Sequence, residues 1–182
     1  MKKTRRYLVP ALLGAMALMG LSSCGGSSPT HTTAHTTVLC GSGPTAIALI
    51  PSADRSPAGT WGTAPTVRVP AGAPPKRLEC AQLITGSGPG AKDGDSVTMQ
   101  YVLATYSTRG VVQSSWTAQP FTFTLGVTGL IPGWMTGVTG MQAGSRRELI
   151  IPPKLGYGAI SPGTGIAPND TLVFVLDMQK IS

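Results

Sequence analysis

Apolar and polar residues alternate in several segments beyond about residue 64, a pattern typical of strands with one buried face. In residues 96–104 four apolar or aromatic side chains fall on the same face: Val97, Met99, Tyr101 and Leu103. The same period of two recurs at 121–125 and, with less contrast, at 147–151. Residues 171–178 are apolar on both faces, which predicts a central strand.

Two weaker patterns precede these strands. Val67 and Val69 suggest a short edge strand ended by Pro70, and residues 77–85 suggest a second strand. One stretch alone, 129–141, has helical spacing, with these residues three or four apart: Ile131, Trp134, Val138 and Met141. Five or six strands around one short helix predict a single α+β domain.

The N-terminus has the layout of a secretory signal, because four positive charges in the first six residues precede an apolar run from Tyr7 to Leu21. This run is shorter than the roughly 20 apolar residues that a membrane-spanning helix needs. We therefore expect a cleavable leader over residues 1–23. Residues 21–24, Leu-Ser-Ser-Cys, resemble the lipobox of bacterial lipoproteins, which implies a diacylglycerol on Cys24. The alternative is an ordinary leader with an incidental cysteine.

Residues 24–63 are rich in Ser, Thr, Gly, Pro and Ala and carry few large apolar groups. Such a segment buries too little surface to order itself, so we expect a flexible tether before a domain at 64–182. The apolar stretch 45–50 is the exception, since it can add a strand to the domain. His31 and His35 lack further ligands and a rigid frame, so no metal site is expected there.

Charge and cysteine content narrow the functional classes. The leader contributes four positive charges to a net charge of +7, and no basic run follows it, which argues against nucleic-acid binding. If Cys24 carries lipid, Cys40 and Cys80 remain as one expected disulfide in an oxidising compartment. Two free thiols are the alternative. We expect an exported protein, lipid-anchored to the outer face of a bacterial membrane in the cell envelope.

The predicted domain holds little of the machinery of covalent catalysis. It contains no histidine, which excludes Ser-His-Asp and Cys-His mechanisms. Its carboxylates show no paired arrangement, and neither a phosphate loop nor a metal-ligand spacing occurs, so no cofactor is expected. What remains is an apolar, aromatic cavity suited to an extended or proline-bearing peptide.

Several motifs carry a resemblance to a known family. They are Gly129-Leu130-Ile131-Pro132-Gly133-Trp134, the segment Arg146 to Pro153, Leu155-Gly156-Tyr157-Gly158, and Thr171-Leu172-Val173-Phe174. In this order, over residues 64–182, they resemble the FKBP family of peptidyl-prolyl cis-trans isomerases. The resemblance implies an antiparallel sheet of five or six strands wrapped around a short helix, with the active pocket between them.

The resemblance also implies roles for individual residues. Trp134 would form the pocket floor, and the Tyr157 hydroxyl and the Ile131 backbone N–H would each hold a substrate carbonyl. The walls would comprise Tyr101, Phe121, Leu130, Ile131, Ile166 and Phe174. Expected partners are proline-containing unfolded or exported polypeptides and a macrolide of the tacrolimus type, bound by a monomer. A dry pocket of this kind would lower the barrier to X–Pro rotation by desolvation and twisting of the amide.

Two pocket positions depart from the family pattern. Val112 stands where the family usually has phenylalanine, and Gln113 where it usually has aspartate. Both changes weaken the pocket wall, so reduced activity is expected. The alternative to a prolyl isomerase is a peptide-binding module or chaperone that keeps the fold without efficient turnover.

Overall fold

The structure is a computed structural model that describes Cys40 and residues 47–182. The expected leader, Cys24 and the part of the tether at 24–39 and 41–46 lie outside the described residues. The elements are β1 (Ala48–Leu49), β2 (Glu79–Ile84), β3 (Ser87–Gly90), β4 (Ser96–Thr105), β5 (Val111–Ser114), β6 (Phe121–Thr124), α1 (Pro132–Val138), β7 (Gln142–Ala143), β8 (Arg146–Ile151), the 3-10 turn η1 (Pro153–Leu155) and β9 (Leu172–Ile181). Among them, no helix has the length and apolar character needed to cross a membrane.

A single sheet in the order β1-β2-β8-β9-β4-β5 forms the framework, and β6 also pairs with β4. All of its pairings are antiparallel except that of β1 with β2, so the expected α+β class is confirmed while the sheet is mixed. The prediction of a central strand at 171–178 is confirmed, because β9 pairs with both β8 and β4. The edge strand predicted at Val67 and Val69 is wrong, since these residues lie outside any strand.

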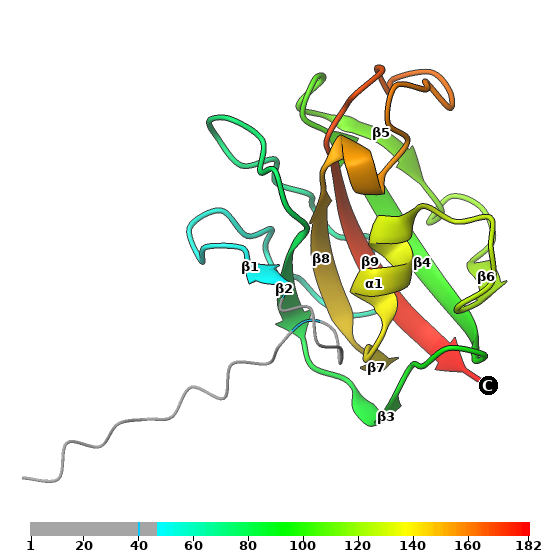
Figure 1. The fold of residues 1–182 in the computed structure, drawn as a ribbon. Helices are drawn as coiled ribbons and strands as arrows, with labels where there is room; N and C mark the ends of the chain where they lie inside the picture. The colour runs from blue at the N-terminus through cyan, green and yellow to red at the C-terminus, as the bar shows by residue number, and fades with distance from the viewer. Residues whose placement is uncertain (1–39, 41–46) are drawn as a thin grey trace, which may run out of the picture. The chain divides into compact units, whose positions relative to one another are not determined.

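Helix α1 covers one face of this sheet, here called the helix face (Figure 1). It lies within the stretch predicted from spacing, and two glycines set its distance from β8. A Cβ atom on Gly133 would overlap the Ile151 side chain, and one on Gly137 would overlap Leu149. The helix therefore rests directly on β8, and larger residues at these two positions would push it away.

Arg147 fastens the C-terminal end of the same helix. Its guanidinium donates hydrogen bonds to the carbonyl oxygens of Gly137 at 2.8 Å and Thr139 at 3.2 Å, and to Gln82 Oε1 at 2.9 Å. Burial lowers the pKa of Arg147 to about 10, so it remains charged at neutral pH. A buried cation that meets the free carbonyls of a helix end stabilises that end.

Apolar side chains pack on both faces of the sheet. The larger cluster fills the helix face and includes Leu103, Trp134, Leu149, Ile151, Phe174 and Leu176. A smaller cluster lies on the opposite side, here called the outer face, and consists of Ile50, Ala81, Ile150 and Val173 with Val67, Val69, Leu83 and Tyr106 against it. Strand β8 is buried along its whole length because both of its faces are covered.

The outer face is covered by residues 47–70, here called the covering segment. This corrects the expected boundary, because the part of the tether from Ile47 to Thr63 belongs to the folded unit rather than to a flexible linker. The apolar stretch noted in the sequence supplies β1, and a disulfide joins Cys40 to Cys80 of β2 with a Cα–Cα distance of 6.1 Å. The remaining contacts of the covering segment are mostly polar. A low content of apolar residues therefore does not mean that this segment is flexible.

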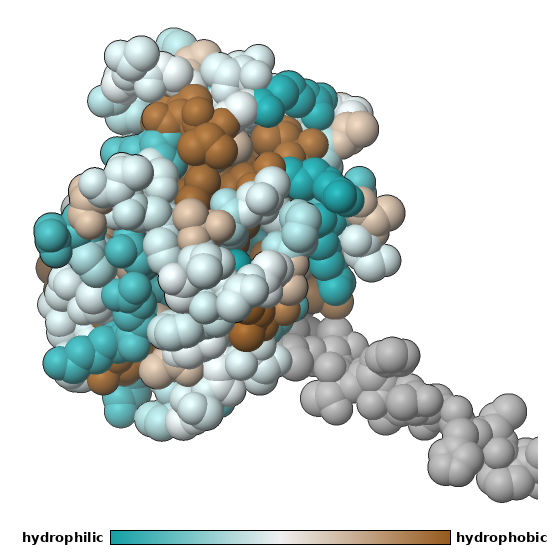
Figure 2. Space-filling view, turned by 180° about the vertical axis from the view of Figure 1, so that it is seen from behind, coloured by the Kyte–Doolittle hydropathy of each residue, from teal (hydrophilic) through white to brown (hydrophobic). Residues whose placement is uncertain are grey.

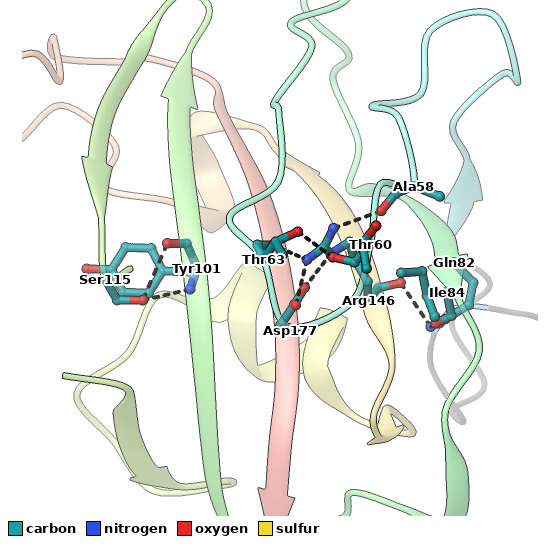
Figure 3. A network of polar contacts seen from close by, with 9 residues as sticks. All are labelled: Ala58, Thr60, Thr63, Gln82, Ile84, Tyr101, Ser115, Arg146 and Asp177. Atoms are coloured by element: carbon teal, nitrogen blue, oxygen red, sulfur yellow. Dashed lines mark hydrogen bonds and ion pairs between the residues drawn. The ribbon is translucent and has the colours of Figure 1, made fainter. Parts of the chain in front are cut away.

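Two buried charges of β8 hold the covering segment. Arg146 forms an ion pair with Asp177 and also donates to the carbonyl oxygens of Ala58 at 2.8 Å and Thr63 at 2.7 Å (Figure 3). Two residues on, Glu148 accepts hydrogen bonds from the Ser56 N–H at 2.9 Å and the Ser56 hydroxyl at 2.6 Å. Burial raises the pKa of the Glu148 carboxyl, and the hydrogen bonds from Ser56 oppose that shift.

Figure 2 views the molecule from behind. The surface on this side is mostly hydrophilic or intermediate, with apolar residues gathered in its upper part.

Arg109 holds the C-terminal end of the covering segment, because its guanidinium donates to the carbonyl oxygens of Pro70 and Gly72 and lies over the Tyr106 ring.

Candidate active site

A cavity of about 200 Å³ opens between α1 and the helix face of the sheet. Strands β4, β6 and β9 contribute one aromatic residue each, α1 contributes Trp134, and Tyr157 follows η1. The lining residues are Tyr101, Gln113, Phe121, Gly129, Leu130, Ile131, Trp134, Tyr157 and Phe174. Residues from six parts of the chain thus meet in one place.

Trp134 lies at the centre of the aromatic side chains. Its ring centroid is 5.2 Å from that of Phe174 and 5.6 Å from that of Tyr101, with both rings edge-on to it. Phe121 and Phe123 of β6 lie 5.8 and 5.7 Å away. These separations are in the range where aromatic pairs attract. The indole is only 4% exposed, so its position is fixed by neighbours on several sides.

The backbone of Tyr101 is held by a short link between β4 and β5. Ser115 Oγ accepts a hydrogen bond from the Tyr101 N–H at 2.8 Å, and the Ser115 N–H donates to the Tyr101 carbonyl oxygen at 3.0 Å (Figure 3). Ser115 therefore continues the pairing of β4 beyond the end of β5 and fixes the backbone of Tyr101, whose ring contacts Trp134.

A second cavity of about 230 Å³ adjoins the first, and Gln113 and Tyr157 line both. Val112, Pro162, Gly163, Thr164 and Ile166 complete its wall. The loop that carries the last four residues approaches β5 closely, because a Cβ atom on Gly165 would lie 2.8 Å from Val112 Cγ1. The short Val112 side chain and a glycine thus stand opposite each other where the loop meets the strand.

Neither cavity is lined by a charged side chain. Burial raises the pKa of the Tyr157 hydroxyl, and burial together with the neighbouring Tyr157 raises that of Tyr101. Both hydroxyls therefore stay protonated, and able to donate hydrogen bonds, over the whole physiological pH range. Ile131 precedes α1 with extended backbone, and its N–H donates to no acceptor within residues 40 and 47–182.

All ten residues that the sequence assigned to the pocket line one or both of these two cavities. Eight line the first, and Val112 and Ile166 line the second. Their catalytic and binding roles stay predictions. Gly129 was missed; its positive φ of 121° marks a turn that lets the backbone border the cavity without a side chain. Phe123, which supports Trp134 from the side of β6, was not among the residues that the sequence assigned to the pocket.

The fold and the cavity define a class of protein, a small α+β domain with an aromatic cavity between one helix and a mostly antiparallel sheet. Residues 88–179 match the model of a family described as FKBP-type peptidyl-prolyl cis-trans isomerase. The chain belongs to this family of enzymes.

Bacterial relatives and solved structures agree with this assignment. The chain is 44% identical over 119 residues to an FK506-binding protein of Streptomyces anulatus, covering 64% of this chain and 96% of the relative. It is 37% identical over 115 residues to a probable FK506-binding protein of Corynebacterium glutamicum, covering 63% and 95%.

The crystal structure of AtFKBP13 matches with a TM-score of 0.52 and 30% identity, over 60% of this chain and 96% of that one. The structure of FkpA from Escherichia coli matches with a TM-score of 0.52 and 33% identity, over 58% and 48%. The family match begins at residue 88, so the covering segment lies outside it.

Proposed function

We propose that the aromatic cavity catalyses cis–trans rotation of X–Pro bonds by taking the amide out of water and holding it while it twists. The observation that carries this proposal is the buried Trp134, surrounded by four aromatic rings in a cavity without a charged side chain. Such a site can exclude water and fit a substrate closely, but it contains neither a nucleophile nor a general base.

Those properties suffice for this reaction. The barrier to rotation is about 18 to 20 kcal/mol and comes from resonance between the amide nitrogen and the carbonyl. Water that donates to the carbonyl oxygen stabilises the planar, more polar ground state. An apolar cavity lacks that stabilisation and so favours the twisted, less polar transition state. No covalent bond to the protein forms or breaks.

Three groups would hold the substrate. The proline ring would pack on the Trp134 indole, which cannot move away because neighbouring rings enclose it. The Tyr157 hydroxyl and the Ile131 N–H would each donate to a carbonyl oxygen of the flanking chain. Fixing the chain on one side allows the other side to rotate, which converts binding energy into a lower barrier.

We propose further that the substrates are exported polypeptides and that the domain is attached to the membrane through lipid on Cys24. The leader-like N-terminus, the lipobox-like sequence and the disulfide between Cys40 and Cys80 support this proposal, because disulfides persist in oxidising compartments. Labelled palmitate should enter the full chain, and Cys24→Ala should abolish both the labelling and the membrane association. Labelling that survives in Cys24→Ala would refute the lipid attachment.

The test of catalysis is the cis-to-trans rate of a proline tetrapeptide with and without the protein. Acceleration that a tacrolimus-type macrolide blocks is the expected result. Tyr157→Phe should fold normally and lower kcat/KM, and equal activity of this variant and the parent would show that Tyr157 does not hold substrate.

Gln113→Asp separates the isomerase from a binding module. The exposed Gln113 amide borders both cavities, and a carboxylate there would restore the charge usual in the family. A well-folded parent without activity, together with an active Gln113→Asp variant, would mean that this chain kept the fold as a peptide-binding module. Activity in both would support the isomerase.

A further inference from the structure

A groove of about 460 Å³ lies where the covering segment meets the C-terminal end of β2. It is lined by Ser52, Arg55, Ser56, Pro57, Ala58, Arg68, Gln82 and Leu83. None of these residues lines either cavity of the candidate active site. All of them also precede residue 88, where the match to the family model begins.

Two guanidinium groups line the groove, and each is fixed by one hydrogen bond to the backbone. Arg55 Nε donates to the Ile50 carbonyl oxygen at 2.9 Å, and Arg68 Nη1 donates to the Ala53 carbonyl oxygen at 3.0 Å. Within the described residues, their other N–H groups donate to no acceptor. An arginine held in this way presents a pre-oriented pair of donors to a planar, two-oxygen anion.

The side chains that line the groove carry two positive charges and no negative one. Asp54 precedes Arg55 in the chain, and the buried Glu148 is close enough for Arg55 and Arg68 to act on its pKa, but both oxygens of Glu148 accept hydrogen bonds from Ser56. No carboxylate lines the groove itself. Two like charges bordering one groove repel each other, and a bound monoanion would relieve that repulsion.

The rest of the lining is apolar or weakly polar. Pro57, Ala58 and Leu83 provide aliphatic surface, and the groove is much larger than a carboxylate alone. We propose that this groove binds a carboxylate attached to an apolar substituent, with the carboxylate between Arg55 and Arg68 and the substituent along the aliphatic residues. The C-terminus of a polypeptide with an apolar last residue and a medium-chain fatty acid both carry this chemistry.

Calorimetric titration of the full chain distinguishes these sources. The probes are acetyl-Ala-Leu as the free acid, the same dipeptide as its C-terminal amide, octanoate, and inorganic phosphate. The free acid should bind at least about tenfold more tightly than the amide, because the amide loses hydrogen bonds between charged groups. Binding of the acid dipeptide and not octanoate would assign the site to polypeptide C-termini, and the reverse result would assign it to fatty acids.

Arg55→Gln combined with Arg68→Gln should weaken binding of the acid by at least about tenfold. Lys76→Gln combined with Arg77→Gln, which removes the same two charges from exposed residues outside the groove, should leave binding unchanged. Isomerase activity toward the tetrapeptide should be the same in all three proteins, so a failure of this site is distinguishable from a failure of the active site.

Three results would overturn the proposal. They are equal binding of acid and amide, tighter binding of phosphate than of both organic acids, and unchanged affinity in the variant that lacks both groove arginines. The comparison of acid with amide uses the unaltered chain, so it decides the matter even if that variant does not fold.

Discussion

The two faces of the sheet are covered by different means. On the helix face, α1 packs aliphatic and aromatic groups against the strands, and the candidate active-site cavity lies within that packing. On the outer face, a segment with little regular structure is held by a small apolar cluster and by hydrogen bonds to buried charges of β8. Strand β8 serves both faces, with Leu149 and Ile151 on one and Arg146 and Glu148 on the other.

The proposed catalytic site therefore lies on one face of the sheet, and the contacts that hold the covering segment lie on the other. The helix face needs a dry, shaped surface, and the apolar contacts that stabilise it also form the cavity. The outer face has no such constraint, and buried charges there fix one particular path of the covering segment, because a displaced segment would leave the charges unpaired. Substitutions on the outer face should therefore change stability without changing the chemistry.

The largest effect is expected from Arg146→Met. This variant removes the partner of the buried Asp177 and the donor to the Ala58 and Thr63 carbonyl oxygens. Leaving one buried charge unpaired costs about 3 to 5 kcal/mol of unfolding free energy, measurable by urea denaturation. The folded fraction should retain its kcat/KM, since the helix face is untouched.

A double variant provides the control for this prediction. Arg146→Met with Asp177→Leu removes both charges, so the loss of stability should be smaller than in the single variant. A double variant less stable than Arg146→Met alone would show that the ion pair is not the main attachment. A fall in kcat/KM under conditions where the single variant is fully folded would break the separation between the two faces.

The disulfide should have the next largest effect. It closes a loop with a sequence separation of 40 that contains β1 and the whole covering segment. Loop-closure entropy predicts a loss of about 4 kcal/mol when Cys40 and Cys80 are both replaced by Ala. Urea denaturation of the double variant measures this loss, and dithiothreitol should have no further effect on it. An unchanged midpoint would mean that the covering segment stays in place without the bond.

The helix face was the more predictable of the two from sequence. Its strands alternate with a period of two, its helix has clear spacing, and three of its aromatic residues, Trp134, Tyr157 and Phe174, fall within motifs of a known family. The covering segment gave only two weak signals, the apolar stretch 45–50 and the pair Val67 and Val69, because few of its side chains are large and apolar. Arg146, Arg147 and Glu148 are three consecutive charged residues, a pattern that in sequence resembles a solvent-exposed part of a strand. Only the tertiary structure shows that this part is covered.

One feature of the helix face was visible in the sequence and was overlooked. Gly133 and Gly137 stand four residues apart in the predicted helix, a spacing that places both on one side and permits close approach to a neighbour. The structure puts that side against β8. The boundary at residue 64 failed for a different reason, since the hydrogen bonds that order the segment come from residues more than 80 positions away.

Gly137→Ala should have a smaller effect on stability, and it should also lower activity. The added methyl group overlaps Leu149, and relief of an overpacked contact costs about 1 to 3 kcal/mol. Because the helix also carries Trp134, its displacement should lower kcat/KM, measured with the proline tetrapeptide. Thr136→Ala, an exposed change in the same helix, is the control and should alter neither property. Full activity in Gly137→Ala would show that the cavity tolerates movement of its floor.

The smallest effect, and the most specific to the outer face, is expected from Glu148→Gln. Burial raises the folded-state pKa of Glu148 above its ordinary value of 4.5, so the folded protein holds this proton more tightly than the unfolded chain does. The stability that follows is fully present below pH 4.5 and is lost as the pH rises through the folded-state pKa. Glutamine can keep an oxygen for the Ser56 N–H and has no charge to bury. The variant should therefore be as stable as the parent near pH 4 and more stable near pH 7, by an amount set by the pKa shift, about 1.4 kcal/mol for each unit.

Urea denaturation of both proteins between pH 4 and 8 measures this difference in stability. If the two curves instead run parallel, the Glu148 carboxylate is compensated by Ser56, Arg55 and Arg68, and these contacts offset its burial in full.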